Sequence, residues 1–330
     1  MKTRFPILFM LFLLFIYPNN LKTSEFGKEG PQNFCSERVT IADRQGASEN
    51  GDSEVNPTSP KTKSSSCLGI NTTQIFSEEL ERKEPKVLIL IIANDDMPAL
   101  IELQKKWKRY MRSDPKHFEV YFIRGNPDIS TPFEIVGDDL FVKTEENYVP
   151  GILNKTILSI EAMLPRFKEF DFILRTNLSS FYVFPRLLNF VKTLPKEQCY
   201  CGMQLHLPEE WVPQFGMIPF VTGSGFFLSM DLAEMLVREK EVIFELNEQL
   251  PDDVLIGYFF DRRHIPSMPA GRIDYPTLQD WVNGKDHIPE DAFHFRAKYE
   301  LGYRHKEDPY EDEIYIGKEL LKMFYPELAE

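Results

Sequence analysis

An uninterrupted apolar run from Val87 to Ala93 is the feature that most constrains this chain. The run has the length of a β-strand, and its β-branched residues favour a central strand that is covered on both faces. The polar residues Asn94 to Asp96 end it, and from Pro98 apolar side chains recur at helical spacing. A strand, a polar turn and a helix in this order indicate the start of a βαβ unit.

The same alternation continues along the chain. Apolar residues at helical spacing mark a helix around Leu153 to Leu164, and further strands are expected at Phe118–Arg124, Asp139–Val142 and Asp171–Arg175. The pattern predicts an α/β fold with a Rossmann-like sheet flanked by helices. Ligands of such sheets bind beyond the carboxyl ends of the strands, which directs attention to residues 94–96 and 176–180.

The second half of the chain has a different character. Pro219–Ser229 reads as a short strand with two glycines, and Ser229 is a plausible N-cap for a following helix. Pro251-Asp252-Asp253 begins another helix with acidic residues first. Neither a P-loop nor a dinucleotide-binding glycine fingerprint follows a strand, which argues against both chemistries.

The N-terminal region is predicted to be a secretory targeting segment followed by a disordered linker. In residues 1–20, a basic start precedes the uncharged run Phe5 to Tyr17, which is shorter than the ~20 residues that span a bilayer comfortably. It is either a cleaved signal peptide or a short signal anchor. Residues 21–85 are rich in Ser, Thr, Asn, Gly, Pro and Lys without an apolar period, so a disordered stem is expected.

Composition narrows the class of protein. Hydrophobic residues make up 42% and aromatic residues 13% of the chain, which excludes a largely disordered chain, a coiled coil and a disulfide scaffold. The formal net charge of −13 argues against nucleic-acid binding. The acidic segment Glu307 to Glu313 is expected to be a solvated face.

Cysteines and sequons fit an oxidising lumen. Cys35 and Cys67 fall in the stem and Cys199 and Cys201 form a tight pair, so up to two bridges are possible. The sequon at Asn71 lies in the stem and is the expected glycosylation site.

Several segments together resemble the β-1,3-glycosyltransferase family, the galactosyltransferase and Fringe-like group with a GT-A fold. The resemblance covers roughly Lys86 to His294, and the segments that carry it are Leu103–Met111, Asn147–Lys155, Phe172–Phe181, Val221–Phe226 and Pro251–Gly257. It implies inverting transfer of a hexose from a nucleotide sugar, usually a UDP-sugar, to a glycan or glycoprotein hydroxyl. A catalytic domain is then expected at 86–330, with a nucleotide-sugar half at 86–191 and an acceptor half at 192–330.

The resemblance also suggests roles for individual residues. Asp252 and Asp253 match an acidic pair at a helix start, and Asp253 is favoured as the general base that takes the acceptor's proton. The alternative is that both only complement the helix dipole. Asn177 and Ser179 stand where the family carries an Asp-x-Asp motif that binds Mn²⁺ or Mg²⁺. Because no carboxylate remains there, either the reaction runs without a metal on cationic side chains, or catalysis has been lost.

The remaining candidates have structural alternatives. Arg175, Asp95 and Asp96 are candidates for donor binding, although a turn also explains the two aspartates. Candidates for the sugar or acceptor pocket are Gly223, Ser224, Gly225, Trp211 and His294. A strand bulge explains the glycines, and core packing explains Trp211 and His294.

Two classes of function remain. The first is a membrane-attached or secreted glycosyltransferase of the secretory pathway, placed in the Golgi lumen as a type II membrane protein by the family resemblance. The second is a non-catalytic glycan-binding or scaffold protein with the same fold. A hydrolase with a carboxylate pair is disfavoured, because adjacent aspartates in one helical turn cannot oppose each other across a glycosidic bond.

Overall fold

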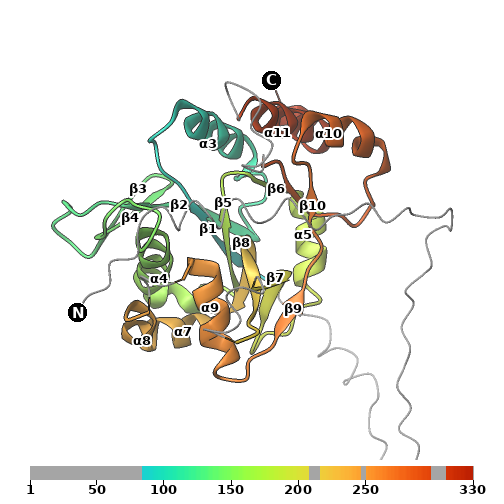
Figure 1. The fold of residues 1–330 in the computed structure, drawn as a ribbon. Coiled ribbons are helices and arrows are strands. Elements are labelled where there is room, and N and C mark those ends of the chain that lie inside the picture. Colours follow the sequence, from blue (N-terminus) through green and yellow to red (C-terminus); the bar gives the residue numbers. More distant parts are fainter. Residues whose placement is uncertain (1–83, 208–215, 247–249, 299–309, 330) are drawn as a thin grey trace, which may run out of the picture. The chain divides into compact units, whose positions relative to one another are not determined.

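A mixed eight-stranded sheet forms the centre of the protein (Figure 1). The computed structural model describes residues 84–207, 216–246, 250–298 and 310–329, and all of these belong to one compact unit. The strand order is β3-β4-β2-β1-β5-β8-β7-β9. The strands are β1 (Val87–Ile92), β2 (Phe118–Gly125), β3 (Phe133–Val136), β4 (Asp139–Val142), β5 (Phe172–Asn177), β7 (Tyr200–His206), β8 (Pro219–Ser229) and β9 (Ser267–Pro269).

The direction of the strands changes at one point in the sheet. β4, β2, β1 and β5 are parallel, whereas β8 is antiparallel to both β5 and β7. Ile92 pairs with Asn177 at the carboxyl edge, and Thr176 pairs with Gly225. The predicted α/β fold, a Rossmann-type mixed sheet flanked by helices, is confirmed, and it is consistent with a GT-A-like arrangement.

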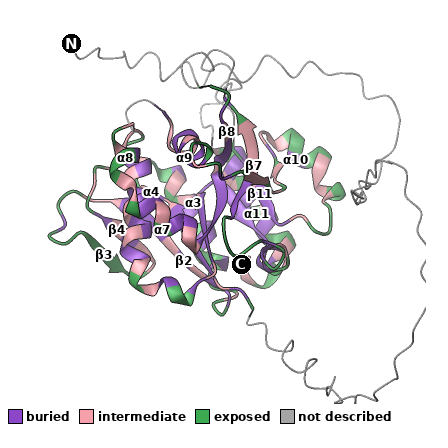
Figure 2. Ribbon diagram, turned by 90° about the horizontal axis from the view of Figure 1, so that it is seen from below, coloured by how far each residue is buried: buried purple, intermediate pink, exposed green. Residues whose placement is uncertain are grey.

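Helices cover both faces of the sheet. On one face lie α3 (Pro98–Tyr110), α5 (Phe184–Val191) and α11 (Glu311–Phe324), and on the other α4 (Gly151–Met163), α7 (Met230–Arg238) and α9 (Asp252–Asp261). α3, α4, α7 and α9 are amphipathic or buried elements whose buried residues are coloured purple in Figure 2. The shorter helical segments are η2 (Leu164–Glu169), α8 (Lys240–Phe244), α10 (Leu278–Gly284), η4 (Lys285–His287) and η6 (Pro326–Leu328).

β1 shows why the apolar run forms a central strand. Val87, Ile89 and Ile91 face the α3 side and Leu88 and Leu90 face the α4 side, and all five are fully buried. An alternating strand with one polar face could not occupy this position, because both faces are covered by helices.

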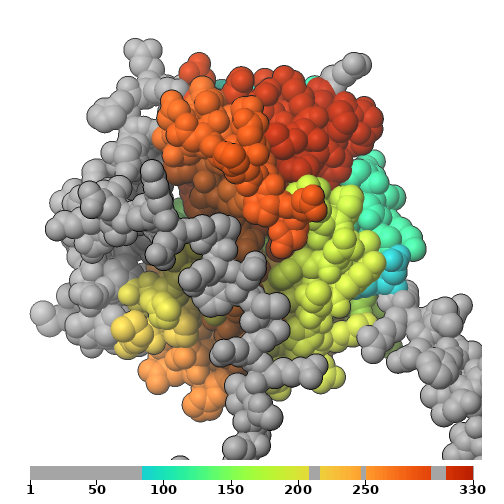
Figure 3. Space-filling model, turned by 90° about the vertical axis from the view of Figure 1, so that its right-hand side faces the viewer, coloured from blue at the N-terminus to red at the C-terminus, as the bar shows by residue number. Residues whose placement is uncertain are grey.

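A small second sheet lies next to the carboxyl end of β5. It has the order β10 (Ile273–Asp274), β11 (His294–Arg296) and β6 (Ser180–Tyr182). Nearby, α11 packs on α3 and on α10, and the surfaces of α10 and α11 adjoin in Figure 3. These elements form a cover beside the end of β5.

The structure corrects one expectation about the surface. Asp312 and Glu313 were expected in a solvated acidic face, but both are buried on the inner side of α11. Asp312 Oδ2 accepts a hydrogen bond from Leu278 N at 3.1 Å, and Glu313 lies within electrostatic reach of the buried Lys106. Burial is tolerated because each acid faces a donor or a cation.

Two other local features differ in detail from expectation. Ser229 is the N-cap residue of α7, but its hydroxyl accepts a hydrogen bond from Cys199 N at 2.9 Å and does not cap the helix. Cys199 and Cys201 are buried free thiols.

Some predictions lie outside the described residues. These are the N-terminal segment 1–20, the stem at 21–83, Cys35 and Cys67, the sequon at Asn71, and Trp211. Within the described ranges, none of the helices has the length and apolarity needed to cross a bilayer. The predicted boundary at 191/192 falls within one continuous sheet, since β5 pairs with β8.

Candidate functional site

The two aspartates predicted as the catalytic pair open α9 and form a cluster with Arg175. Asp253 Oδ2 accepts a hydrogen bond from Gly223 N at 2.8 Å, and its Oδ1 accepts one from Val254 N at 2.9 Å. Asp252 forms an ion pair with the buried Arg175 guanidinium. Carboxylates in a first helical turn also interact favourably with the helix dipole, so the start of α9 suits both acids.

The two acids have different electrostatic surroundings. Burial, followed by the negative charge of Asp252, raises the pKa of Asp253 to about 6, although the Gly223 N–H and the charge of Arg175 oppose this shift. A general base works best when its pKa lies near the operating pH. Asp252 is committed to an ion pair, whereas Asp253 is held by neutral N–H groups. Asp253 is therefore the better placed of the two to accept a proton.

Tyr148 stands beside this cluster and was not predicted individually. Partial burial, followed by the charges of Asp252 and Asp253, raises the pKa of Tyr148 to about 12. The residue is nonetheless 58% exposed. An exposed, protonated phenol within electrostatic range of two carboxylates offers a ligand both an aromatic face and a hydroxyl.

Arg175 is held more tightly than its strand position alone suggested. Its Nη1 donates to Gly223 O and its Nη2 to Asp252, and only 2% of the residue is exposed. A Cβ atom on Gly223 would lie 2.6 Å from Arg175 Nη1. The glycine thus makes room for the arginine of the same chain. Contact of Arg175 with a phosphate stays a prediction, and it would require exchange of at least one present partner.

A second cluster lies in the turn after β5. Asn177 Oδ1 accepts hydrogen bonds from the hydroxyl groups of Ser179 at 2.8 Å and Ser180 at 3.3 Å. Ser180 Oγ donates to Ser224 O at 2.7 Å, and Arg272 donates to Ser224 Oγ. Residues predicted for the donor side and for the sugar pocket therefore meet here, and Arg272 supplies a cation that the sequence reasoning missed.

His294 belongs to the same cluster. It is buried and stacks on Tyr182 with ring centroids 4.3 Å apart, and its Nε2 lies 3.2 Å from Ser180 Oγ. Burial, followed by the charge of Arg272, lowers the pKa of His294 well below its ordinary value. A Cβ atom on Gly225 would lie 2.2 Å from Tyr182 Oη. The surroundings of His294 therefore fit the alternative that it packs in the core. Contact of His294 with a ligand stays a prediction.

Asp95 lies at a pocket beyond the ends of β1 and β2. It accepts a hydrogen bond from Gln104 Nε2 at 2.8 Å and pairs with Arg124 Nη1 at 3.0 Å. Although burial opposes ionisation, these two partners lower the pKa of Asp95. Asp96 is exposed beside it. The pocket has a volume of about 450 Å³ and is lined by Asn94, Asp95, Ile101, Gln104, Lys108, Arg124, Gly125, Asp139, Phe141 and Glu146.

Lys155 connects this pocket to the backbone at the strand ends. Its Nζ donates to Ala93 O at 3.3 Å and forms an ion pair with Glu146, whose Oε2 accepts from Gly125 N at 2.7 Å. Burial lowers the pKa of Lys155, and the charges of Arg175 and Arg124 act in the same direction. Lys155 therefore lies within electrostatic range of both the Asp95 pocket and the Arg175 cluster.

The donor set after β5 does not suit a divalent cation. Mn²⁺ and Mg²⁺ prefer carboxylate and other hard oxygen ligands. At this turn the Asn177 oxygen already accepts from two hydroxyl groups, and Asp95 is paired with Arg124. Across the described residues, no group of three or more His, Cys, Asp or Glu could hold a metal ion. The metal implied by the family resemblance therefore has no matching ligand set here.

Comparison with known proteins finds similarity among solved structures. No protein-family model matches the chain, and no curated protein matches it. Among solved structures it is similar to a glycosyltransferase involved in the glycosylation of the major capsid of PBCV-1. The TM-score is 0.37 and the sequence identity is 13%, over 64% of this chain and 93% of that chain. A similarity at this level leaves the function to be argued from the residues themselves.

Proposed function

We propose that this protein is an inverting glycosyltransferase that moves a hexose from a nucleotide sugar, of the UDP-sugar type, to a glycan or glycoprotein hydroxyl. The observation that carries the proposal is Asp253, a carboxylate whose pKa is raised to about 6 where β8 meets the start of α9. The Asp95 pocket at the neighbouring strand ends supplies a second, separate space for the nucleotide. This arrangement follows the rule that ligands bind beyond the carboxyl ends of parallel strands.

The proposed reaction assigns one step to each group. The acceptor oxygen forms a bond to the anomeric carbon of the donor while its proton passes to an Asp253 carboxylate oxygen. The bond between the anomeric carbon and the diphosphate oxygen breaks, and the electron pair leaves with the nucleotide. Arg124 and Lys108 line the pocket and Lys155 lies behind it, so these cations would stabilise the charge on the leaving diphosphate.

The proposal includes metal-independent transfer. The family resemblance implies Mn²⁺ or Mg²⁺, and the donor sets at Asn177 and Asp95 favour cationic side chains in its place. Residence in the secretory pathway, as a Golgi type II membrane protein or a secreted protein, is proposed from the Phe5 to Tyr17 run, the stem that follows it and the family resemblance.

Nucleotide release by the full-length chain tests the proposal. The chain is treated with EDTA and incubated with a panel of nucleotide sugars and glycan acceptors, with and without added Mn²⁺. Release that persists after EDTA treatment is expected, and the Asp253→Asn variant should lose it by at least about 100-fold. Asp128→Asn is the matched control, because it makes the same chemical change on an exposed loop.

The Asp253 variant is informative only if it folds. The substitution removes a carboxylate whose ionised form is disfavoured by burial, but its amide oxygen can accept only one of the two backbone N–H bonds, from Gly223 or from Val254. The two effects on stability oppose each other, so the melting temperature of the variant is measured together with its nucleotide release. Nucleotide release that is equal in Asp253→Asn and Asp128→Asn would contradict the proposed base. Binding of a glycan without release from any donor would favour the alternative, a non-catalytic glycan-binding protein, which the pairing of Arg175 with Asp252 also permits.

A further inference from the structure

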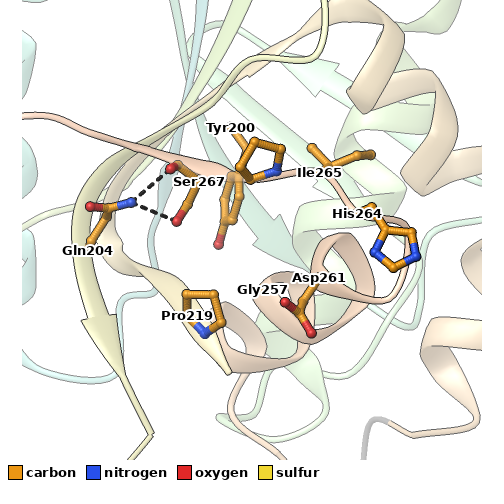
Figure 4. A pocket seen from close by; sticks show the side chains of 9 residues that line it. Tyr200, Gln204, Pro219, Gly257, Asp261, His264, Ile265 and Ser267 are labelled. Carbon is orange, nitrogen blue, oxygen red and sulfur yellow. Dashed lines mark hydrogen bonds between the residues drawn. The ribbon is translucent and has the colours of Figure 1, made fainter. Parts of the chain in front are cut away.

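A second cavity opens between the last turns of α9 and strands β7, β8 and β9 (Figure 4). It has a volume of about 380 Å³, near the lower end of the ~300–1,000 Å³ that is usual for small-molecule sites. None of its residues was predicted to have a function. The lining residues are Tyr200, Gln204, Pro219, Gly257, Asp261, His264, Ile265, Pro266 and Ser267.

Two polar side chains of the wall are held in place by hydrogen bonds. Gln204 Nε2 donates to Ser267 O and to Ser267 Oγ, both at 2.8 Å, and its Oε1 lies on the side turned away from the open space in Figure 4. Tyr200 Oη accepts from Val221 N at 3.0 Å, which leaves its own proton to be donated. Figure 4 shows the Tyr200 hydroxyl directed into the open space. Fixed donors and acceptors of this kind lose little entropy when they bind a ligand.

Asp261 and His264 add two further polar groups from the end of α9. Among the residues that the structure describes, none forms a hydrogen bond or ion pair with either side chain. In Figure 4 the Asp261 carboxylate lies at the edge of the space into which Tyr200 points. The cavity therefore presents the Tyr200 hydroxyl, which keeps its proton for donation, and the Asp261 carboxylate and His264 imidazole, which no described residue pairs with.

His264 occupies a backbone position that normally favours glycine. Its φ angle is +57°, in the left-handed region. His264 N donates to Asp261 O at 3.0 Å and Ile265 N donates to Phe260 O at 3.1 Å, which is the hydrogen-bond pattern of a Schellman motif. Glycine is the usual residue at this position because it has no Cβ penalty there. An imidazole at a strained position on the rim of a polar cavity is a reason to look for a ligand.

We infer that this cavity binds one neutral monosaccharide unit. Sugar hydroxyl groups donate and accept hydrogen bonds at once, which matches a wall with the Tyr200 hydroxyl as a donor and the Asp261 carboxylate as an acceptor. The apolar surfaces of Pro219, Ile265 and Pro266 suit the C–H faces of a sugar ring. The Asp261 carboxylate disfavours a phosphate or another anion.

The position of the cavity relates it to the proposed active site. Asp253 and Asp261 lie eight residues apart in sequence, so their backbones are separated by about 12 Å along α9. If the proposed transfer is correct, the unit bound here belongs to the acceptor glycan and lies away from the reacting hydroxyl. That assignment rests on the proposed function, whereas binding of a saccharide in this cavity does not.

Saturation-transfer NMR on the full-length chain tests the inference. The probes are the methyl glycosides of glucose, galactose, mannose and N-acetylglucosamine. At least one glycoside should show saturation transfer. Asp261→Asn should weaken its binding about tenfold, the loss of a hydrogen bond to a charged group. His264→Gly should also weaken it, while its melting temperature stays equal or rises because glycine relieves the backbone strain.

Controls separate this cavity from the proposed active site. Asp253→Asn should retain glycoside binding even though it loses nucleotide release, and a UDP titration reports the Asp95 pocket independently. Glycoside binding without any transfer would leave the inference intact and count against the proposed function alone. No saturation transfer from any glycoside, or equal transfer in the wild type and both cavity variants, would overturn the inference.

Discussion

Asp252 and Asp253 are neighbours in sequence, yet they have different chemical environments. Asp252 forms a charge pair with Arg175, whereas Asp253 accepts two backbone N–H groups. Burial, followed by the negative charge of Asp252, raises the pKa of Asp253. The resulting asymmetry assigns proton transfer to one residue and charge balance to the other.

This asymmetry makes a prediction about pH dependence. A base must be deprotonated to act, so nucleotide release should fall as the pH drops below about 6, the pKa of Asp253. Asp252→Asn removes a charge that raises this pKa and frees Arg175 to stabilise the Asp253 anion. The acidic limb of the rate profile should then move to lower pH by about one unit or more. A profile with an unchanged midpoint in the variant would contradict the coupling.

The same shift has a definite sign for stability. The pKa of Asp253 is raised in the folded state, from an ordinary value of 3.8 to about 6. Its contribution to the free energy of unfolding is therefore fully present below about pH 4 and is lost as the pH rises through about 6. Asp253 thus lowers stability at neutral pH, which is a typical cost of a functional group held in a buried position.

At the scale of elements, Lys106 of α3 braces the turn that carries Asn177 and Ser179, and α11 leaves room for it. Lys106 of α3 donates to Leu178 O at 3.1 Å and to Ser180 O at 3.3 Å, and it reaches this position past Gly317 of α11. A Cβ atom on Gly317 would lie 2.8 Å from Lys106 Cδ. The absence of a side chain at one position of α11 therefore allows a cation to hold the turn.

A double-mutant cycle tests this brace. Replacing glycine by alanine in a helix interior normally stabilises it by about 1 kcal/mol. Gly317→Ala should fail to gain this amount and should lower the free energy of unfolding, because the new methyl group meets Lys106. In a Lys106→Ala background the same change should become stabilising. Urea unfolding measures all four chains, and equal effects of Gly317→Ala in both backgrounds would contradict the proposed contact.

Secondary-structure elements could be predicted where the local sequence pattern is clear. The strand starting at Val87 and the strand Pro219–Ser229 could be placed from sequence because they are predominantly apolar. β3 was missed, since its four residues are all exposed and give no core signal. The inner face of α11 was misjudged because Asp312 and Glu313 look like surface residues, and only the distant Leu278 and Lys106 explain their burial.

The site was predictable only where one segment carries it. Asp252, Asp253 and Asn177 follow strands or begin a helix, so topology points to them. Arg272 comes from a segment without a motif, and Tyr148 lies in the segment Asn147–Lys155, to which no individual role was assigned; the places of both depend on tertiary packing. The cavity at Gln204 and Asp261 could not be predicted, because its walls come from residues more than fifty positions apart.

At the scale of the whole molecule, one sheet connects the predicted donor and acceptor halves. One end of this sheet is β3, an edge strand on which Phe133, Ile135 and Val136 are 40%, 41% and 54% exposed. Apolar edge strands are templates for pairing with other chains. The edge strand β3, at the opposite end of the sheet from β9, is therefore a site where two copies of the chain could associate.

A charge on this edge should reduce association. Ile135→Lys should slow aggregation of the full-length chain under heating. Its free energy of unfolding should change by less than about 0.5 kcal/mol, as for other surface substitutions. Light scattering during thermal denaturation measures the first effect and circular dichroism the second. Unchanged scattering in the variant would show that another surface drives association.

Strand β8 joins the two polar clusters through consecutive residues. Gly223 contacts Arg175 and Asp253, whereas the next residue, Ser224, contacts Ser180 and Arg272. Side chains of a strand alternate between its faces, so a shift by one position moves every residue to the opposite side. A single inserted codon in this stretch would disconnect both clusters at once, even if every original amino acid were retained. The number of residues in β8 therefore matters as much as their identity.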